Sequence, residues 1–268
     1  MTETTGGEAR ADLTFIGTAT TLLHLGPFTV LTDPNFLHRG QHAYLGRGLT
    51  AKRVTEPAMS IDELPPLDAV VLSHLHGDHF DRVARRGLTR DAPIVTTTHA
   101  AGRLRRFGFS TVGLDTWEEH TLERDSHRLT VQSLPGVHAY GVLGKLLPPV
   151  MGSLLRWTDN GQVRRTLYQT GDTLTGPHLR EIHERHPSID GAVVHLGGTR
   201  VLGAVVTLDA KGGLELLEAV EPGYAVPVHY DDYTRFRSSL SDFLSAVGST
   251  RWSSRIRVVE RGQTISLD

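Results

Sequence analysis

The chain has 268 residues, of which 38% are hydrophobic and 22% are charged, and its formal net charge at pH 7 is −2. This composition excludes a disordered chain, and the small charge provides no field that would draw the protein to nucleic acid or to an anionic membrane. The sequence has no cysteine but 15 histidines. Disulfides are therefore excluded, and a bound metal ion would have nitrogen and oxygen ligands.

One domain is expected over residues 1–268, with residues 1–11 as a disordered tail, because chains of this length commonly fold around one core. The N-terminal segment carries acidic residues and no apolar run, so it fits neither a secretory signal nor a basic transit peptide. No apolar run approaches the roughly 20 residues that cross a bilayer. We expect a cytoplasmic protein without a transmembrane segment, and the sequence indicates no oligomeric state.

The first part of the chain alternates apolar and polar residues as β-strands do. Strands are expected over residues 13–17, 20–25 and 28–33, with turn signals at Gly17 and Gly26. The polar stretch 35–57 is too long for a plain connection. We interpret it as a loop over the functional site.

Strand and helix patterns then alternate, which predicts a layered α/β fold. The expected strand and helix pairs are 68–73 with a helix from about Phe80, 93–97 with 99–108, 165–172 with 177–186, 190–196 with 208–220, and 224–230 with 236–247. A closing pair of strands is expected at 255–260 and 264–267.

Residues 73–80, SHLHGDHF, place three histidines and an aspartate directly after an apolar strand. These side chains cannot all lie on one face of a strand or helix, so the segment must be a loop folded around a ligand, for which a metal ion is the obvious candidate. Ligands of open α/β sheets bind beyond the carboxyl ends of strands. A histidine-rich surface loop is the alternative; it is disfavoured because three other segments end in metal-binding side chains, His138, Asp172 and His229.

The segment HLHGDH resembles the His-x-His-x-Asp-His signature of the metallo-β-lactamase superfamily, whose other ligands are a histidine, an aspartate preceded by glycine, and a final histidine. The resemblance implies a four-layer αββα sandwich and two divalent metal ions. Their implied ligands are His74, His76 and His138 for the first ion and Asp78, His79 and His229 for the second, with Asp172 bridging. Zn²⁺ suits imidazole and carboxylate ligands first, with Mn²⁺ or Fe²⁺ as alternatives.

Segments 14–36 and 51–81 further resemble the branch that contains N-acyl-phosphatidylethanolamine phospholipase D-like enzymes and ascorbate-6-phosphate lactonase-like proteins. Two positions depart from these relatives. Thr18 stands where many of them have histidine, and His195 stands where the phospholipase-like branch usually has a proline-containing strand end.

The implied reaction is hydrolysis by a metal-bridging hydroxide, because two divalent ions lower the pKa of a water that they share. The same ions would polarise a carbonyl or phosphoryl oxygen, so a phosphodiester or a lactone or other ester is the expected substrate. Asp78 is expected to orient the water and accept its proton. His195 is the second catalytic candidate, for substrate contact or leaving-group protonation, with a hydrogen-bonded structural histidine as the alternative. Asp33 either supports a ligand histidine or forms a turn before Pro34.

Three further segments bear on the substrate. Residues 230–233 follow the last ligand and are expected to line the site, with a solvated loop as the alternative. The apolar stretch 141–157 either forms a pocket for a lipophilic part of a small-molecule substrate or packs in the core. Arginines 103, 105 and 106 are expected on a solvated helix face away from the strand ends.

Two other functional classes remain open. A metal-binding or scaffold protein without turnover could keep the same fold, although the complete ligand set gives it no support. A nuclease is disfavoured, since the chain has no basic arm and no nucleic-acid-binding motif. We therefore expect a small-molecule substrate and no nucleic acid partner.

Overall fold

Two β-sheets lie face to face in the computed structural model of the protein, which describes residues 10–46, 48–201 and 203–268. The strands of the first sheet, from edge to edge, are β17 (Thr264–Ser266), β1 (Ala11–Gly17), β2 (Thr20–Leu25), β3 (Phe28–Thr32), β6 (Ala69–Leu72), β7 (Ile94–Thr97) and β8 (Thr111–Leu114). Those of the second are β16 (Tyr224–Val228), β13 (Gly191–His195), β12 (Gln162–Gln169), β11 (Met151–Asp159), β10 (His127–Pro135) and β9 (Glu119–Arg124).

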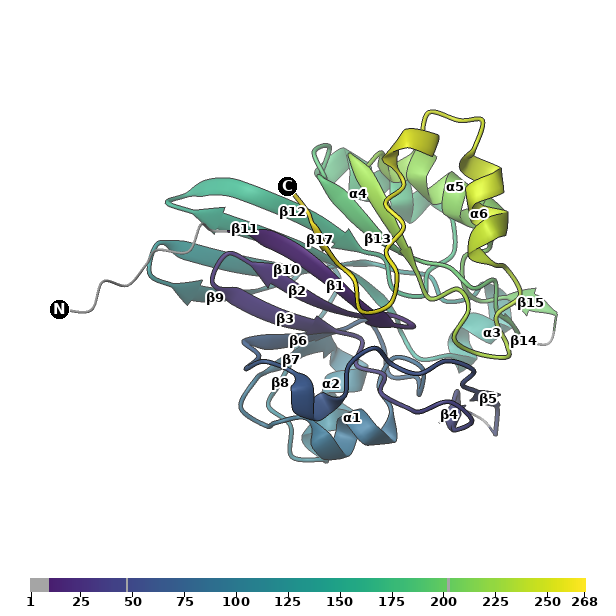
Figure 1. Cartoon of the computed structure of the whole chain (residues 1–268), viewed down its shortest axis with the longest axis horizontal. Helices are drawn as coiled ribbons and strands as arrows, with labels where there is room; N and C mark the ends of the chain where they lie inside the picture. The colour runs from purple at the N-terminus through teal and green to yellow at the C-terminus, as the bar shows by residue number, and fades with distance from the viewer. Residues whose placement is uncertain (1–9, 47, 202) are drawn as a thin grey trace.

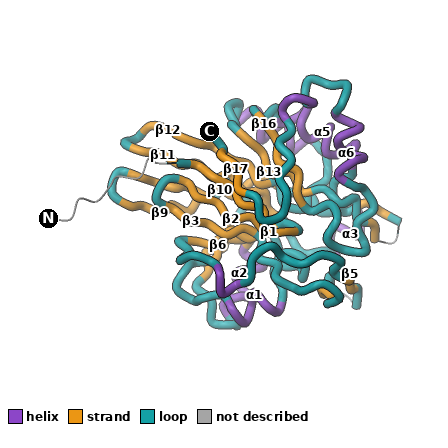
Figure 2. Tube along the Cα trace, viewed as in Figure 1, coloured by secondary structure: helices purple, strands orange, loops and turns teal. Residues whose placement is uncertain are grey.

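Helices cover both outer faces of this sandwich (Figures 1 and 2). On the side of the first sheet lie α1 (Arg82–Gly87) and α2 (Thr98–Arg105), and on the side of the second lie α4 (Pro177–Arg185), α5 (Ala210–Val220) and α6 (Leu240–Val247). The predicted four-layer αββα fold is therefore confirmed. The remaining elements are α3 (Gly141–Leu146), the hairpins β4–β5 (His42–Tyr44, Thr50–Lys52) and β14–β15 (Arg200–Val201, Ala204–Val205), and the short 3₁₀ helices η1 (Ile61–Glu63) and η2 (Ser253–Arg255).

Strand β6 shows why the apolar run before the histidines is continuous. Successive strand residues point to opposite faces of a sheet. Val71 packs in the core between the two sheets, whereas Val70 and Leu72 pack with Ala84 of α1 and Leu104 of α2. Each such side chain stabilises the fold by about 1.5–3 kcal/mol when fully buried. Both faces of β6 are thus held, which fixes the position of the loop that follows it.

Each sheet is antiparallel in one half and parallel in the other. In the first sheet β3, β6, β7 and β8 are parallel neighbours. In the second sheet β12, β13 and β16 are parallel. Since parallel strands end at the same edge of a sheet, the segments after these strands gather at one end of the sandwich.

Most predicted elements are present, with shifted bounds. The helix expected from Phe80 begins at Arg82, because the Asp81 side chain caps it by accepting hydrogen bonds from the backbone N–H groups of Val83 and Ala84. Ala11, expected in a disordered tail, is fully buried in β1, while residues 1–9 of that predicted tail lie outside the described residues. Segment 35–57 is not a plain loop, since it contains the β4–β5 hairpin.

The predicted strand at 255–260 is wrong. Only Ile256 forms a bridge, to Ala225 of β16 in the second sheet, whereas β17 pairs with β1 in the first sheet. The segment between Ile256 and β17 crosses from the second sheet to the first, so it cannot form a strand along the edge of either sheet. Within the described ranges 10–46, 48–201 and 203–268, no helix has the length and apolar character needed to span a membrane.

Candidate metal centre

The predicted ligands come together at the end of the sandwich where the parallel strands terminate. The loop 74–79 follows β6, Asp172 follows β12, His229 directly follows β16, and His138 lies just after β10. In each of three groups, ligand atoms lie within 4.8 Å of one another. These groups are His74, His76 and His138; His74, His79 and Asp172; and Asp78, His79 and His229.

The first group consists of imidazole nitrogens alone. Nδ1 of His76 lies 3.0 Å from Nε2 of His74 and 3.2 Å from Nε2 of His138. Nitrogen ligands about 2.0 Å from a tetrahedral Zn²⁺ are separated by about 3.3 Å. The observed separations therefore fit three corners of one tetrahedral site.

Asp172, a member of the second group, lies between the first group and the third. Its Oδ2 is 3.9 Å from Nε2 of His74 and 3.2 Å from Nε2 of His79. On the far side of His79, Nε2 of His229 is 3.6 Å from Oδ2 of Asp78. A single carboxylate thus borders both groups, as a bridging ligand would.

The donor atoms of this cluster are buried and short of partners. His74, His79 and His229 have no exposed surface, and Asp172 is only 2% exposed. Nε2 of His79, Nε2 of His229 and Oδ1 of Asp172 make no hydrogen bond within the described residues. Each unsatisfied buried polar group costs about 1–3 kcal/mol. Since a cation would satisfy all of them together, the residues fit a metal site.

Burial sets the protonation of the first group. It lowers the pKa of His74 and His138, and it lowers the pKa of His76 to about 4, with the neighbouring His138 contributing. These imidazoles are therefore neutral near pH 7, which is the form that binds a metal ion.

The second group favours a positive charge at its centre. Burial alone would lower the pKa of His79, but the carboxylates of Asp172 and Asp33 raise it well above its ordinary value. Burial alone would raise the pKa of Asp172, but His229 and His79 hold it well below its usual range. A divalent cation placed here would supply the positive charge that these carboxylates attract.

Asp33 lies behind the cluster and contacts His79. The structure therefore favours its role as a support of a ligand histidine over a turn before Pro34. Its carboxylate accepts hydrogen bonds from the backbone N–H and the hydroxyl of Ser73, and Oδ2 lies 3.2 Å from Nδ1 of His79. Burial would raise the pKa of Asp33, but His79 and His195 lower it to about 2. The resulting carboxylate fixes the ring orientation of His79 and turns its Nε2 towards Asp172.

Backbone carbonyls fix two further imidazoles. Nδ1 of His138 donates to the carbonyl of Val206 at 2.9 Å, and Nδ1 of His229 donates to that of Leu196 at 3.0 Å. A carbonyl can only accept, so Nδ1 carries the proton in both rings and Nε2 is left as the ligand atom.

His195 lies behind the ligands. Its side chain is fully buried, with Nε2 3.3 Å from Oδ2 of Asp33 and Nδ1 3.2 Å from the hydroxyl of Thr170. Its ring stacks on that of His79, with 5.9 Å between the centroids. These contacts favour the structural alternative over direct contact with substrate.

Among residues 230–233 only Asp231 is exposed, so the alternative of a solvated loop holds for that residue alone. Asp232 is fully buried, accepts a hydrogen bond from the backbone N–H of Thr18 at 2.8 Å, and pairs with Arg261 and Arg53. The hydroxyl of Tyr233 donates to Asn35. His229 has a left-handed backbone (φ 63°), which turns the chain at this point. The segment is held beneath the ligands by the fully buried Arg53 and the partly exposed Arg261, a support that its sequence alone did not indicate.

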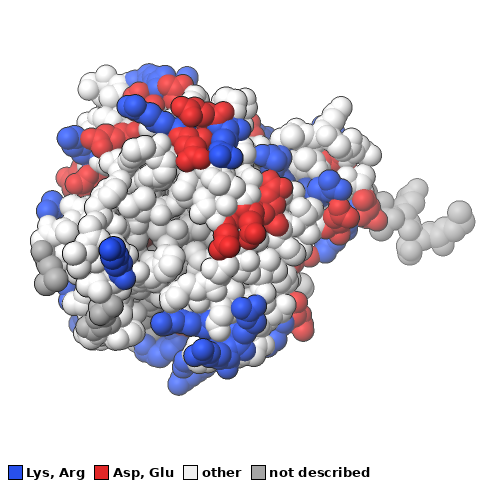
Figure 3. Space-filling model, turned by 180° about the vertical axis from the view of Figure 1, so that it is seen from behind, with Lys and Arg blue, Asp and Glu red and all other residues white. Residues whose placement is uncertain are grey.

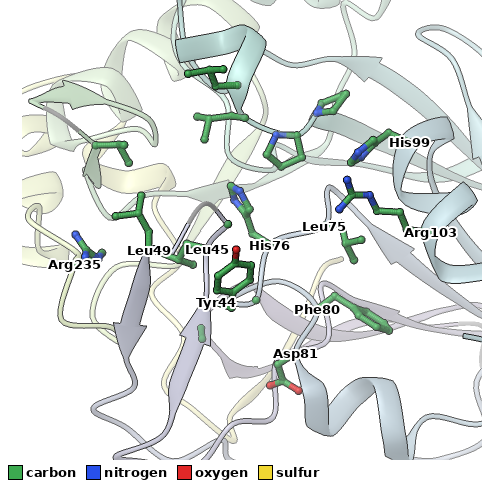
Figure 4. Close-up of a pocket in the computed structure, with 18 of the residues that line it drawn as sticks. Tyr44, Leu45, Leu49, Leu75, His76, Phe80, Asp81, His99, Arg103 and Arg235 are labelled. Carbon is green, nitrogen blue, oxygen red and sulfur yellow. The ribbon is translucent and has the colours of Figure 1, made fainter.

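A cavity of about 1590 Å³ opens at His76 (Figure 4). Its walls come from the β4–β5 hairpin, helices α1 and α2, and residues 143–149, so the pocket interpretation of stretch 141–157 is supported for this part. The other part, β11, packs in the core through Leu154, Leu155 and Trp157. Arg103 and Arg106 also line the cavity, which corrects the expectation that they lie away from the site; Arg105 does not.

The comparison with known families agrees with this geometry. The sequence profile of the family described as "Beta-lactamase superfamily domain" matches residues 29–230. The chain belongs to this family. A UPF0173 metal-dependent hydrolase of Nanoarchaeum equitans is 23% identical over 185 residues, which cover 68% of this chain and 79% of the relative.

Two solved structures show the same fold. An isothiocyanate hydrolase from Delia radicum gut bacteria superposes with a TM-score of 0.79 at 22% identity, covering 95% of this chain and 98% of the other. A possible metal-dependent hydrolase of Veillonella parvula superposes with a TM-score of 0.81 at 22% identity, covering 96% and 100%. This beta-lactamase superfamily protein thus shares its fold with proteins named as hydrolases and carries histidine and aspartate clusters that could bind metal ions.

Proposed function

We propose that the protein is a dinuclear metal-dependent hydrolase. The observation that carries the proposal is the position of Asp172 Oδ2, between His74 of one buried ligand group and His79 of the other. In this proposal His74, His76 and His138 hold one ion, Asp78, His79 and His229 hold the second, and Asp172 touches both. The nitrogen-rich ligand set favours Zn²⁺, with Mn²⁺ or Fe²⁺ as alternatives.

The bound ions and the ligand Asp78 would have separate roles in hydrolysis. When bound, two divalent ions lower the pKa of the water that they share and polarise the oxygen of the group to be cleaved. Oδ2 of Asp78 lies towards His229, whereas its Oδ1 makes no hydrogen bond within the described residues. Asp78 can therefore keep one oxygen as a ligand and use the other to orient the attacking water and take up its proton.

His195 and Asp33 act as positioning residues in this scheme. His195 has no exposed surface and contacts Asp33, which in turn contacts His79. In this proposal His195 acts through the orientation of His79, in place of the predicted catalytic role in substrate contact or leaving-group protonation.

The substrate class follows from the chemistry that two such ions support. Phosphodiesters, lactones and other esters present an oxygen that the ions can polarise. The resemblance to the phospholipase D-like and lactonase-like branch favours the same classes. The apolar residues of the cavity at His76 suit a small molecule with a lipophilic part.

The test is metal analysis of the purified protein and of three variants. We expect about two ions per chain in the Zn²⁺-loaded wild type and fewer in Asp78→Ala and His79→Ala, together with loss of hydrolysis on a panel of phosphodiesters, lactones and esters. His38→Ala is the matched control, because this histidine is exposed and pairs with Glu56 outside the ligand groups. Full metal content in both ligand variants would contradict the assignment.

A further inference from the structure

The cavity at His76 carries a strong excess of positive charge. Four of its cations belong to the region of α1 and α2, namely Arg82, Arg85, Arg103 and Arg106, and three come from other segments, namely Lys145, Arg200 and Arg235. The whole chain, in contrast, has a net charge of −2. Seven of the 28 lysines and arginines thus line this one opening, and Figure 3 shows a group of Lys and Arg side chains along the lower edge of the face that it draws.

Few carboxylates face these cations. Among the described residues that line the cavity, Asp81 is the only acidic one, and its oxygens accept hydrogen bonds from the backbone N–H groups of Phe36, Leu37, Val83 and Ala84. Within residues 10–46, 48–201 and 203–268, none of the seven cations forms an ion pair with aspartate or glutamate, whereas cations elsewhere on the surface commonly do. Such a concentration of unpaired positive charge favours an anionic ligand.

Helix α2 directs part of this charge into the cavity. His99 and Arg103 are four residues apart and lie on one face of the helix, and Arg106, three residues further on, caps its C-terminal end. Figure 4 shows His99 and Arg103 on the same side of the cavity, close to Leu75, with Arg235 on the opposite side and His76 between them. Nδ1 of His99 is buried and makes no hydrogen bond within the described residues.

Apolar side chains surround the same opening. Leu45, Leu49, Leu75, Leu143 and Leu147 line the cavity together with these cations. Guanidinium groups bind carboxylates and phosphates in a bidentate manner, and such charge-assisted bonds are stronger where water is partly excluded. The cavity thus combines an apolar wall with an anion-binding edge.

We propose that His99, Arg103 and Arg106 form a specificity subsite for an anionic group of the substrate, a carboxylate or phosphate remote from the bond that is cleaved. The apolar wall receives the body of the substrate, and His76 marks where the cavity meets the metal centre. The preferred substrate is then an amphipathic organic anion. This inference rests on the proposed function for its hydrolytic part, but the binding of the anion can be tested without turnover.

Binding of two fluorescent probes tests the subsite. 1-Anilinonaphthalene-8-sulfonate carries a charge that N-phenyl-1-naphthylamine lacks, while their ring systems are the same. We expect the Zn²⁺-loaded protein to bind the sulfonate about tenfold more tightly at low salt, with a smaller difference at high salt. In Arg103→Gln/Arg106→Gln this preference falls to about twofold, and the affinity for the neutral probe is unchanged.

A charge-matched control separates a subsite from a general field. Arg86→Gln/Arg105→Gln removes the same charge from the same two-helix region, but neither residue lines the cavity. We expect the control to keep the sulfonate preference within about twofold of wild type. Equal losses in the two double variants, or no preference in the wild type, would overturn the proposal. So would a preference that disappears on metal removal alone, since the anion would then bind at the metal ions.

Two esters connect the subsite to turnover. Mono-p-nitrophenyl adipate ends in a carboxylate, whereas p-nitrophenyl hexanoate has the same chain length and no charge. We expect Arg103→Gln/Arg106→Gln to lower kcat/KM for the adipate about tenfold and to leave the hexanoate unaffected. If neither ester nor any other panel substrate is cleaved while the probe results hold, the hydrolase proposal fails and the subsite stands. If a short single-stranded oligonucleotide displaces the sulfonate more effectively than decanoate does, the small amphipathic ligand is wrong.

Discussion

The ligand cluster lies at the buried ends of parallel strands, whereas the cavity beside it is walled by a small hairpin, short helices and partly exposed side chains. In the cluster, His79, His138 and His229 are each held by a partner behind them, either Asp33 or a backbone carbonyl. In the cavity, Tyr44 and Leu146 are 59% and 42% exposed. The buried, hydrogen-bonded cluster is suited to holding metal ions in fixed positions, and the partly exposed cavity wall to contact with the substrate in the proposed function.

Removal of Asp172 is expected to have the largest effect, because this carboxylate borders both ligand groups. We expect Asp172→Ala to lose metal and to lower hydrolysis at least about 10³-fold, since metal ions supply several kcal/mol of transition-state stabilisation. Metal analysis and initial rates measure the change. Asp159→Ala, at a surface ion pair with Arg164, is the control and should keep both properties.

The ion pair of Asp232 with Arg53, beneath His229, is expected to contribute chiefly to the free energy of unfolding. Asp232→Ala leaves the fully buried Arg53 without its carboxylate partner, and breaking a buried pair costs about 3–5 kcal/mol. Urea denaturation measures the loss in the free energy of unfolding. Arg251→Ala, which breaks exposed pairs with Glu218 and Glu221, should cost less than about 1 kcal/mol. Equal losses in the two variants would show that the buried network is not a support.

Asp33→Asn tests the residue that contacts the ligand His79 from behind. The amide keeps the shape of the carboxylate but loses the charge that orients His79. We expect metal affinity to fall about 10- to 100-fold, as is typical when such a partner is lost. Competition with a chelator measures this affinity. Asp68→Asn, which lies in the same sheet region and contacts Thr29 and Arg124, should retain it.

The smallest effect is expected in the cavity wall. Leu143→Ala should lower kcat/KM for long-chain esters about two- to tenfold, because apolar contact is lost, and should leave acetyl esters and metal content unchanged. Leu244→Ala removes a similar side chain from helix α6, which does not line the cavity. If Leu143→Ala lowered kcat/KM equally for long-chain and acetyl esters, or for neither, residues 143–149 would not contact the acyl chain of the substrate.

The sequence was informative where one short segment dictates the geometry. The loop 74–79 carries four potential ligands after a strand buried on both faces, and His138, Asp172 and His229 also follow strands, so their convergence could be predicted from the chain alone. The alternation of strands and helices predicted a layered α/β fold, and the resemblance alone implied the four-layer sandwich.

Prediction failed where a residue acts through a distant partner. Asp232 is buried because Arg53 and Arg261, far from it in sequence, neutralise its charge. Arg103 and Arg106 are exposed, as the predicted solvated face requires, but no local pattern shows that residues 143–149 and the β4–β5 hairpin enclose a space beside them. Strands β9, β10 and β11 pair antiparallel in the second sheet, which a pattern of alternating strands and helices does not predict.

Anomalous diffraction from crystals of the Zn²⁺-loaded protein tests the central claim most directly. We expect two peaks, one bound by His74, His76 and His138 and the other by Asp78, His79 and His229, with Asp172 in contact with both. A single ion, or two ions of which either lies beyond coordinating distance of Asp172, would contradict it.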